Sequence, residues 1–406
     1  VIPLPFRHLS RLSSEWRDHA LPDFPDLTGK TILQVAPELS AGGVERTVLE
    51  VTEAIVKAGG RALLASRGGR QEAAFEALGG ELFRMDAKSK NPITLKLNEG
   101  KLKRLIAREG VDLVHARSRA PAWSAYWAAK AMGVPFVTTY HGAYSGKTKL
   151  KKRYNSVMAK GDLVIANSQW IAAHVQTEHG VPFERVVTIP RGVDLEAFDP
   201  AAVPLARVKA VRDALGLADD PRQILLLPGR LTEWKGQLIA IEALAMLAPD
   251  ERDKLVLVLA GDAQGRNTYV TRLEQAVVSH GLDRGVIMSE HITDMPAAYL
   301  ASDIVLAPSV RPEAFGRVAA EASAMARPVI VTDHGGGRET VIEGETGARV
   351  EPGNAQALAG AIRALLSVGP LARDGMGRAG QAHVRQHFSK QGLQAATLGV
   401  YKTLLE

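Results

Sequence analysis

The chain has 406 residues, 46% hydrophobic and 23% charged, and that length predicts two or three globular domains. It contains no cysteine, which excludes disulfides and thiolate metal sites, and no apolar run reaches the roughly 18 residues that span a bilayer. A formal charge of +6 with 5% aromatic residues favours a phosphate-bearing or anionic-membrane partner and argues against a nucleic acid.

Residues 1–28 are predicted to form an N-terminal extension. Proline and charge interrupt this stretch, so it lacks the apolar segment of a secretory signal. Leu9, Leu12 and Trp16 share one face of a candidate amphipathic helix. Together with the missing cysteine, this pattern favours a cytoplasmic location.

Short β-branched runs alternate with helical patterns along the chain. The first five are TILQVA (31–36), RALLAS (61–66), VDLVHA (111–116), PFVTTY (135–140) and DLVIAN (162–167). The next five are QILLLPG (223–229), KLVLVLAG (254–261), GVIMSE (285–290), DIVLAPS (303–309) and PVIVTD (328–333). Near-continuous apolar strands separated by helices indicate parallel sheets that are buried on both faces.

The polar, proline-bearing stretch 195–222 separates the two sets of strands. This break favours two doubly wound α/β domains, 29–195 and 196–385, over a single eight-stranded barrel. Residues 386–406 are predicted to form a terminal helix. Its apolar residues at helical spacing are Leu393, Ala396, Val400 and Leu404.

The segment KTKLKKR (147–153) carries five cations in seven residues. Leu150, Tyr154, Val157 and Met158 recur through it and beyond it at helical spacing. The pattern fits a basic amphipathic helix on anionic lipid, and it fits a solvated helix face equally well. The candidate membrane contacts are Lys147, Lys149, Lys151, Lys152 and Arg153.

Ligands of open parallel sheets bind beyond the carboxyl ends of the strands, so the residues that follow each strand are candidates. Gly42 and Gly43 open the helix after the first strand, where they either let a phosphate approach or only shape the turn. His141 ends PFVTTY, and a histidine in that place is either a site residue or a structural one. A second substrate is expected near the end of VDLVHA, at His115, Arg117 and Arg119.

Arg230 and Lys235 follow QILLLPG within one β–α loop. Two cations that converge there need a counter-anion, which a diphosphate would supply. The alternative interpretation is a pair of exposed loop charges.

Two glutamates lie at the helix that is predicted to begin near Gly316, one before it and one within it. Glu321 lies five residues into it, about 7.5 Å along the axis, which is the separation between a diphosphate and its ribose. Glu313 precedes the helix, where a sugar's hydroxyls would lie. Alternatively, Glu313 caps the helix and Glu321 is a solvated acid. The cluster HGGGRET (334–340) either lines the same crevice or forms a tight turn.

Several catalytic motifs are missing from the sequence. No G-x-G-x-x-G follows a strand, which disfavours a dehydrogenase. There is also no D-x-D metal clamp, nucleophile elbow or Walker loop.

From Thr31 to Phe388 the chain resembles the GT-B retaining glycosyltransferases of family four, through six motifs. These are GGVER (42–46), TYHG (139–142), IPRGVDLEAFDP (189–200), GRLTEWKG (229–236), GD (261–262) and EAFGRVAAE (313–321). The resemblance implies two Rossmann-like domains facing a central cleft, with the C-terminal helix crossing back to the first. It also implies that the second domain binds a nucleotide-sugar and the first binds the acceptor.

The resemblance also implies roles for individual residues. Arg230 and Lys235 would neutralise the donor diphosphate, Glu313 would bind the sugar, and His141 would contact that sugar near the reaction centre. The residues expected to bind the donor are Gly42, Gly43, Gly229, Gly261, Phe315, Gly316, Arg317, Val318 and Glu321. His115, Arg117 and Arg119 would bind the acceptor. SEH (289–291) stands where the family usually has a glycine, which leaves the choice between UDP and GDP open.

The expected reaction retains the anomeric configuration through front-face departure and attack, without metal or cofactor. The expected acceptor is a membrane glycolipid such as lipopolysaccharide core or another envelope lipid. The protein would then lie peripherally on the cytoplasmic face of the inner membrane. A nucleotide-sugar epimerase and a non-catalytic nucleotide-sugar-binding module are the alternatives, while a glycan phosphorylase has no support in the sequence.

Overall fold

The computed structural model describes residues 24–406 except 41, 145, 147, 290 and 291. The predicted helix containing Leu9, Leu12 and Trp16 lies outside the described residues. The chain divides into two compact units. Unit 1 comprises the chain up to Gly192 together with Lys390–Glu406, and unit 2 comprises Val193–Ser389.

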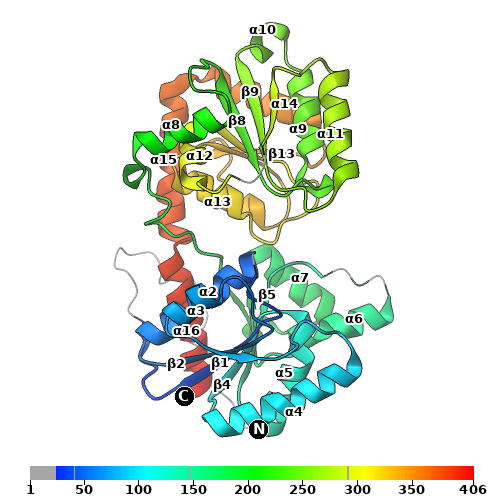
Figure 1. The fold of residues 1–406 in the computed structure, drawn as a ribbon, viewed down its shortest axis with the longest axis vertical. Coiled ribbons are helices and arrows are strands. Elements are labelled where there is room, and N and C mark those ends of the chain that lie inside the picture. The colour runs from blue at the N-terminus through cyan, green and yellow to red at the C-terminus, as the bar shows by residue number, and fades with distance from the viewer. Residues whose placement is uncertain (1–23, 41, 145, 147, 290–291) are drawn as a thin grey trace. The chain divides into compact units, whose positions relative to one another are not determined.

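Unit 1 is a parallel seven-stranded sheet in the order β3-β2-β1-β4-β5-β6-β7, with helices on both faces (Figure 1). Its strands are β1 (Thr31–Val35), β2 (Arg61–Ser66), β3 (Glu81–Arg84), β4 (Leu113–Ala116), β5 (Phe136–Tyr140), β6 (Leu163–Ala166) and β7 (Val186–Thr188). Its α-helices are α2 (Gly43–Lys57), α3 (Glu72–Ala77), α4 (Pro92–Glu109), α5 (Arg119–Met132), α6 (Lys149–Asn155), α7 (Gln169–His179) and α16 (Lys390–Leu405).

Unit 2 is a parallel six-stranded sheet in the order β10-β9-β8-β11-β12-β13. Its strands are β8 (Gln223–Pro228), β9 (Leu255–Ala260), β10 (Val286–Ser289), β11 (Ile304–Ala307), β12 (Val329–Thr332) and β13 (Gly347–Val350). Its α-helices are α8 (Leu205–Ala214), α9 (Gln237–Ala245), α10 (Pro249–Arg252), α11 (Asn267–Ser279), α12 (Met295–Ala301), α13 (Arg317–Ala324), α14 (Ala355–Ser367) and α15 (Gly369–His387).

Strand β9 shows why these sequences form doubly covered sheets. Leu255, Leu257 and Leu259 belong to one apolar core, whereas Val256 and Val258 belong to another. Alternate residues of a strand point to opposite faces, so a strand that is apolar at every position must be covered on both. Helices on the two faces of the sheet supply that cover (Figure 1), which confirms the predicted fold class of two Rossmann-like domains.

Helix α16 packs into unit 1, as predicted for the C-terminal helix. Leu393, Leu398 and Tyr401 are buried in the core that also contains residues of β1 and α2. Gln394 Nε2 donates a hydrogen bond of 2.7 Å to the carbonyl of Glu50 on α2. The last helix is therefore an integral part of unit 1.

Two features of the fold differ from the sequence-based expectation. Strands β3, β7 and β13 were not predicted, and each lies at an edge of its sheet, where burial is incomplete. The stretch 195–222, expected from residue 196 onward to belong to the second domain, lies inside unit 2, but its helix α8 was not predicted. Within the described residues no single helix is long and apolar enough to cross a bilayer, and one pair, α14 with α15 bent by 109°, meets only the criteria of length and composition.

Candidate functional site

Unit 2 has a topological switch point between β8 and β11, because the chain moves outward from β8 to β9 and β10 and then returns to the other side of β8. The loops that follow β8 and β11 diverge there and leave a crevice at the carboxyl edge of the sheet. The short 3₁₀ helix η5 (Glu233–Lys235) follows β8, and Glu313 follows β11. These two loops supply the central contact of the candidate site.

Lys235 and Glu313 form an ion pair across this switch point. Lys235 Nζ donates to Glu313 Oε1 at 2.7 Å, and the two side chains are 14% and 16% exposed. Ser309 Oγ also donates to Glu313 Oε1, and the ammonium of Lys235 lies 4.5 Å from the ring centroid of Trp234. Glu313 therefore does not serve as a helix cap, and Lys235 is not a freely exposed loop charge.

The surroundings of Glu313 keep its carboxylate charged. Burial alone would raise the pKa of Glu313, but the charge and hydrogen bond of Lys235, with the hydrogen bond from Ser309, hold that pKa below its usual range. Because the folded-state pKa is lowered, ionisation stabilises the fold above the unfolded pKa, and this contribution is lost as the pH falls through the folded pKa. At neutral pH the carboxylate can accept hydrogen bonds from a ligand.

Helix α13 begins where the sequence predicted, with Gly316 at its N-cap. Gly316 has φ +95°, and a Cβ there would lie 2.7 Å from the Cα of Gly337, so both the backbone conformation and the packing require glycine. Within the described chain no side chain caps this helix start. The glycine cluster 335–337 packs against the loop 313–316, which makes it part of the wall that shapes this helix start.

Glu321 lies on α13 and is 8% exposed, so it is not a solvated helix acid. Tyr299 Oη donates to Glu321 Oε2 at 3.2 Å, and Arg317 Nη1 lies 3.8 Å from Glu321 Oε1. Val318 is partly buried on the same helix, and Phe315 packs edge-on against Phe388 in the core. The side chain of Phe315 thus anchors the loop.

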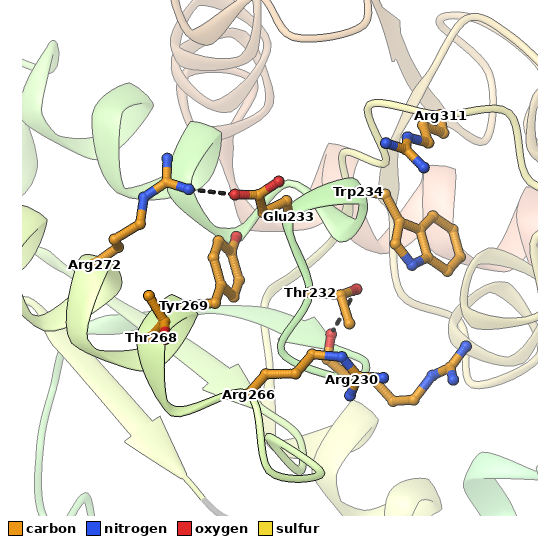
Figure 2. Close-up of a pocket in the computed structure, with 9 residues that line it drawn as sticks. All are labelled: Arg230, Thr232, Glu233, Trp234, Arg266, Thr268, Tyr269, Arg272 and Arg311. Carbon is orange, nitrogen blue, oxygen red and sulfur yellow. Dashed lines mark hydrogen bonds and ion pairs between the residues drawn. The ribbon is translucent and has the colours of Figure 1, made fainter.

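A cavity of about 550 Å³ opens beside η5 and is lined by four arginines (Figure 2). Its lining residues are Arg230, Thr232, Glu233, Trp234, Arg266, Thr268, Tyr269, Arg272 and Arg311. Of the four arginines, only Arg272 has an ion-pair partner among the described residues, namely Glu233. The cavity therefore carries excess positive charge that an anionic ligand would neutralise.

Gly229 and Gly261 lie at the ends of β8 and β9, close to this cavity's Arg230. A Cβ on Gly261 would lie 1.9 Å from the carbonyl oxygen of Gly229. The backbones approach so closely that Gly261 is required by packing, whether or not a ligand binds there.

In unit 1, His141 follows β5 and accepts a hydrogen bond at Nδ1 from Arg191 Nη2, at 2.9 Å. Arg191 follows β7 and also donates to the carbonyl of Gly43 and, at 3.1 Å, to Thr47 Oγ1. Gly42 is the N-cap of α2 and is exposed. The sequence-predicted residues His141 and Gly43 are thus joined by an arginine that sequence reasoning did not select.

His115 and Arg117 were expected to bind the acceptor, but the structure buries both of them instead. His115 is 0% exposed, with its Nδ1 2.6 Å from Tyr401 Oη and its Nε2 2.7 Å from Thr139 Oγ1. Burial raises the pKa of Tyr401 to about 12, so its hydroxyl is protonated at neutral pH. Burial, together with the charge of Arg117, holds the pKa of His115 well below its usual range. Both ring nitrogens of this neutral imidazole therefore have partners within unit 1.

Arg117 is 1% exposed and donates to Gln34 Oε1 from Nε at 2.8 Å and from Nη2 at 2.6 Å. The third candidate, Arg119, is half-buried, donates to Asn155 Oδ1 at 2.8 Å and lies 3.9 Å from the ring centroid of Tyr144. Of the three, only Arg119 lies near the surface.

The basic segment differs in part from the expected amphipathic helix. Helix α6 has seven residues, and Val157 and Met158, expected on its apolar face, are buried in unit 1. Lys152 pairs with Glu178 at 2.8 Å, and Leu150 is 79% exposed. Lys149, Lys151 and Arg153 are also exposed. Lys147 lies outside the described residues, as do Glu290 and His291 of the segment expected near the base.

Sequence reasoning missed Ser309, Arg191, Arg266 and Arg311. Ser309 and Arg311 lie four and two residues before Glu313, and the end of a strand was the available signal for them. Arg266 and Arg191 lie in loops. Sequence alone does not distinguish a loop arginine that contributes to a site from one that is only exposed to solvent.

Known proteins resemble this chain along most of its length. A family model described as Glycosyltransferase Family 4 matches residues 41–197, and one described as Glycosyl transferases group 1 matches residues 210–383. The D-inositol 3-phosphate glycosyltransferase of Xylanimonas cellulosilytica is 31% identical over 316 residues, which is 71% of each chain.

Two solved structures are also similar. A glycosyltransferase from Rickettsia africae is 33% identical, with a TM-score of 0.85, over 93% of this chain and 99% of that one. HepE from Anabaena, solved in complex with UDP, is 25% identical, with a TM-score of 0.79, over 92% of this chain and 99% of that one.

Proposed function

Because this chain belongs to glycosyltransferase family 4 and is a GT-B glycosyltransferase that uses nucleotide-sugar donors, we propose that it transfers a hexose-type sugar with retention of configuration. Its donor would be UDP- or GDP-linked, and the similarity to HepE, solved with UDP, favours UDP. Unit 2 would bind the donor, and His141 of unit 1 would contact the transferred sugar.

The observation that carries this proposal is the Lys235–Glu313 pair beside the arginine-lined cavity. A nucleoside diphosphate-sugar offers anionic phosphates to cations and hydroxyl donors to a carboxylate. Arg230 and Lys235 would bind the diphosphate, Glu313 the sugar hydroxyls and Glu321 the ribose. The amides that open α13 would add donors toward the phosphates.

In the proposed reaction the glycosidic C–O bond to the diphosphate breaks and its electron pair stays on the leaving phosphate oxygen. The acceptor hydroxyl attacks from the same face of the sugar and gives its proton to that departing oxygen. Charge develops on the leaving phosphate oxygen, which Arg230 and Lys235 would stabilise. Glu313 and Glu321 are assigned to donor binding and are therefore not available as the nucleophile and acid of a double displacement.

Donor binding gives the direct test. We expect UDP or GDP to raise the melting temperature of the full chain, because a ligand that binds only the native state stabilises it. Arg230→Gln should abolish that rise, whereas Arg363→Gln, which removes an exposed arginine paired with Glu251 elsewhere in unit 2, should leave it unchanged. An unchanged rise in Arg230→Gln would contradict the assignment of the diphosphate site.

Product analysis separates the alternatives. A glycosyltransferase releases free nucleotide when an acceptor is supplied, an epimerase converts the donor sugar without any acceptor, and a binding module does neither.

For the acceptor, we propose a membrane glycolipid at an anionic surface, on the cytoplasmic face of the inner membrane. The exposed Leu150 among Lys149, Lys151 and Arg153 supports this proposal, because cations near an anionic bilayer are each worth about 1 kcal/mol. The relatives named for D-inositol 3-phosphate provide the competing acceptor, which is a soluble phosphate ester.

We expect vesicles containing anionic lipid to retain the full chain, and Lys149→Glu/Lys151→Glu to reduce that retention about tenfold or more. The matched control Lys209→Glu/Lys254→Glu changes two lysines of unit 2 and should behave like the wild type. Sedimentation with neutral and anionic vesicles measures the effect. Equal retention on both kinds of vesicle, or transfer to D-inositol 3-phosphate alone, would contradict the glycolipid proposal.

A further inference from the structure

Arg191 lies at the carboxyl edge of the unit 1 sheet, three residues beyond the end of β7, and is 8% exposed. Its guanidinium donates to three acceptors, namely the carbonyl of Gly43, Thr47 Oγ1 and His141 Nδ1. These acceptors lie at the start of α2 and just after β5. Arg191 therefore connects two separate segments of unit 1 through one planar group, whose orientation the acceptors fix.

The chemistry of the two side chains determines where the imidazole proton lies. A guanidinium has only donors, so the atom that faces Arg191 Nη2 at 2.9 Å must present a lone pair. His141 Nδ1 is then unprotonated, and its single ring proton lies on Nε2. His141 is thereby held as a neutral imidazole with an N–H donor at Nε2.

Local packing supports this placement of the guanidinium. A Cβ on Gly43 would lie 2.6 Å from Arg191 Nη1, so a side chain at that position would displace the guanidinium. Thr47 donates its own hydroxyl proton to the carbonyl of Gly43 at 2.8 Å, which leaves the lone pairs of its Oγ1 for Arg191. The first turn of α2 thus supplies two acceptors and the space for this guanidinium.

We propose that Arg191 is a positioning residue that fixes the tautomer of His141, so that His141 acts toward the substrate as a hydrogen-bond donor through Nε2 and not as a general base. The kinetic part of this inference rests on the proposed function, because it assigns His141 to the transferred sugar. A donor at Nε2 suits a hydroxyl oxygen of that sugar. The tautomer itself is a property of unit 1 alone.

Nitrogen NMR of the full chain, labelled with ¹⁵N-histidine, tests the tautomer directly. The signal of His141 is identified by its absence in His141→Gln. At neutral pH we expect a protonated Nε2 and an unprotonated Nδ1, and Arg191→Met should convert this pattern to a mixture of tautomers. Arg191→Lys, which keeps a donor, should preserve it. Arg185→Met, which changes an arginine that donates to backbone carbonyls of unit 1, should have no effect.

A double-mutant cycle tests whether Arg191 affects the reaction through His141. Arg191→Met should lower kcat about tenfold or more with little change in the donor KM, as expected for loss of an orienting partner. In the His141→Gln background the same substitution should cost less than about twofold, since Arg191 acts through His141. Arg191→Lys should recover part of the lost kcat.

Two results would overturn the inference. One is a protonated Nδ1 on His141 in the wild type, and the other is an equal kcat loss from Arg191→Met with and without His141. If Arg191→Met does not fold, Gly43→Ala displaces the guanidinium while keeping both side chains, and the same NMR signal decides. If the wild type transfers no sugar, the proposed function fails, whereas the NMR result still decides the tautomer.

Discussion

We expect Lys235→Met to lower the transfer rate by roughly a hundredfold or more, which corresponds to about 3 kcal/mol of lost transition-state stabilisation. The ammonium is the cation that the structure places against Glu313, at the switch point where the leaving diphosphate is proposed to lie. Initial rates at saturating donor, compared with wild type, measure the loss. Lys209→Met removes an exposed lysine that pairs with Asp213 on α8 and should leave the rate unchanged.

Stability must be separated from catalysis in this experiment, because Lys235→Met leaves the partly buried carboxylate of Glu313 without its cation. Lys235→Met/Glu313→Gln removes the charge as well and should therefore be more stable than Lys235→Met alone. Its activity should remain as low or lower. A double variant that recovered the transfer rate would show that Lys235 acts only by neutralising Glu313.

Gln34→Leu is expected to destabilise unit 1 by about 3–5 kcal/mol, more than the loss of Arg117 itself. The amide oxygen of Gln34 accepts two hydrogen bonds from Arg117, and its amide nitrogen donates to Thr52 Oγ1 at 2.8 Å. Removing the acceptor leaves a buried guanidinium with its desolvation uncompensated. Arg117→Met should cost only about 1–3 kcal/mol, because it leaves the neutral oxygen of Gln34 without its donor, while buried Glu50, which also interacts with the charge of Arg117, keeps its ion pair with Arg46.

Hydrogen exchange of the β1 and β4 amides reports the free energy of opening of unit 1. It therefore measures the stability lost in Gln34→Leu and in Arg117→Met. The double variant Gln34→Leu/Arg117→Met should lie closer to wild type than Gln34→Leu alone, since neither partner then remains buried without the other. The exposed Gln356→Leu serves as the control for the glutamine-to-leucine change. A larger loss in Arg117→Met than in Gln34→Leu would contradict this account.

The fold could be predicted from the sequence wherever a strand lies inside a sheet. The run Leu255–Ala260 is apolar at every position because both faces are covered. Strand β3, by contrast, contains two exposed residues among four, and β7 has only three residues, all partly buried. Edge strands have one neighbour and are covered less completely, so β3, β7 and β13 do not show the continuous apolar pattern on which the prediction relied, although the edge strand β10 was predicted from GVIMSE.

The candidate site could be predicted only in part. Residues that follow the strands were found because parallel strands bring their carboxyl ends to one edge. The pairing of Lys235 with Glu313 joins positions 78 apart in sequence, which no local pattern reveals. His115 was placed with the acceptor because a histidine at a strand end looks like a site residue. Its partners, Tyr401 and Thr139, come from distant segments and place it in the core.

The return of α16 to unit 1 has a consequence for synthesis on the ribosome. The strands of unit 1 are made first, but Lys390–Glu406 emerge only after roughly 200 further residues, all of unit 2, have been translated. At elongation speeds of about 5–20 residues per second this interval lasts roughly 10–40 s. During that time the surface that later receives Leu398 and Tyr401 has no covering helix, and unit 2 has its entire sequence before that helix is made. The domain begun first is therefore the one completed last.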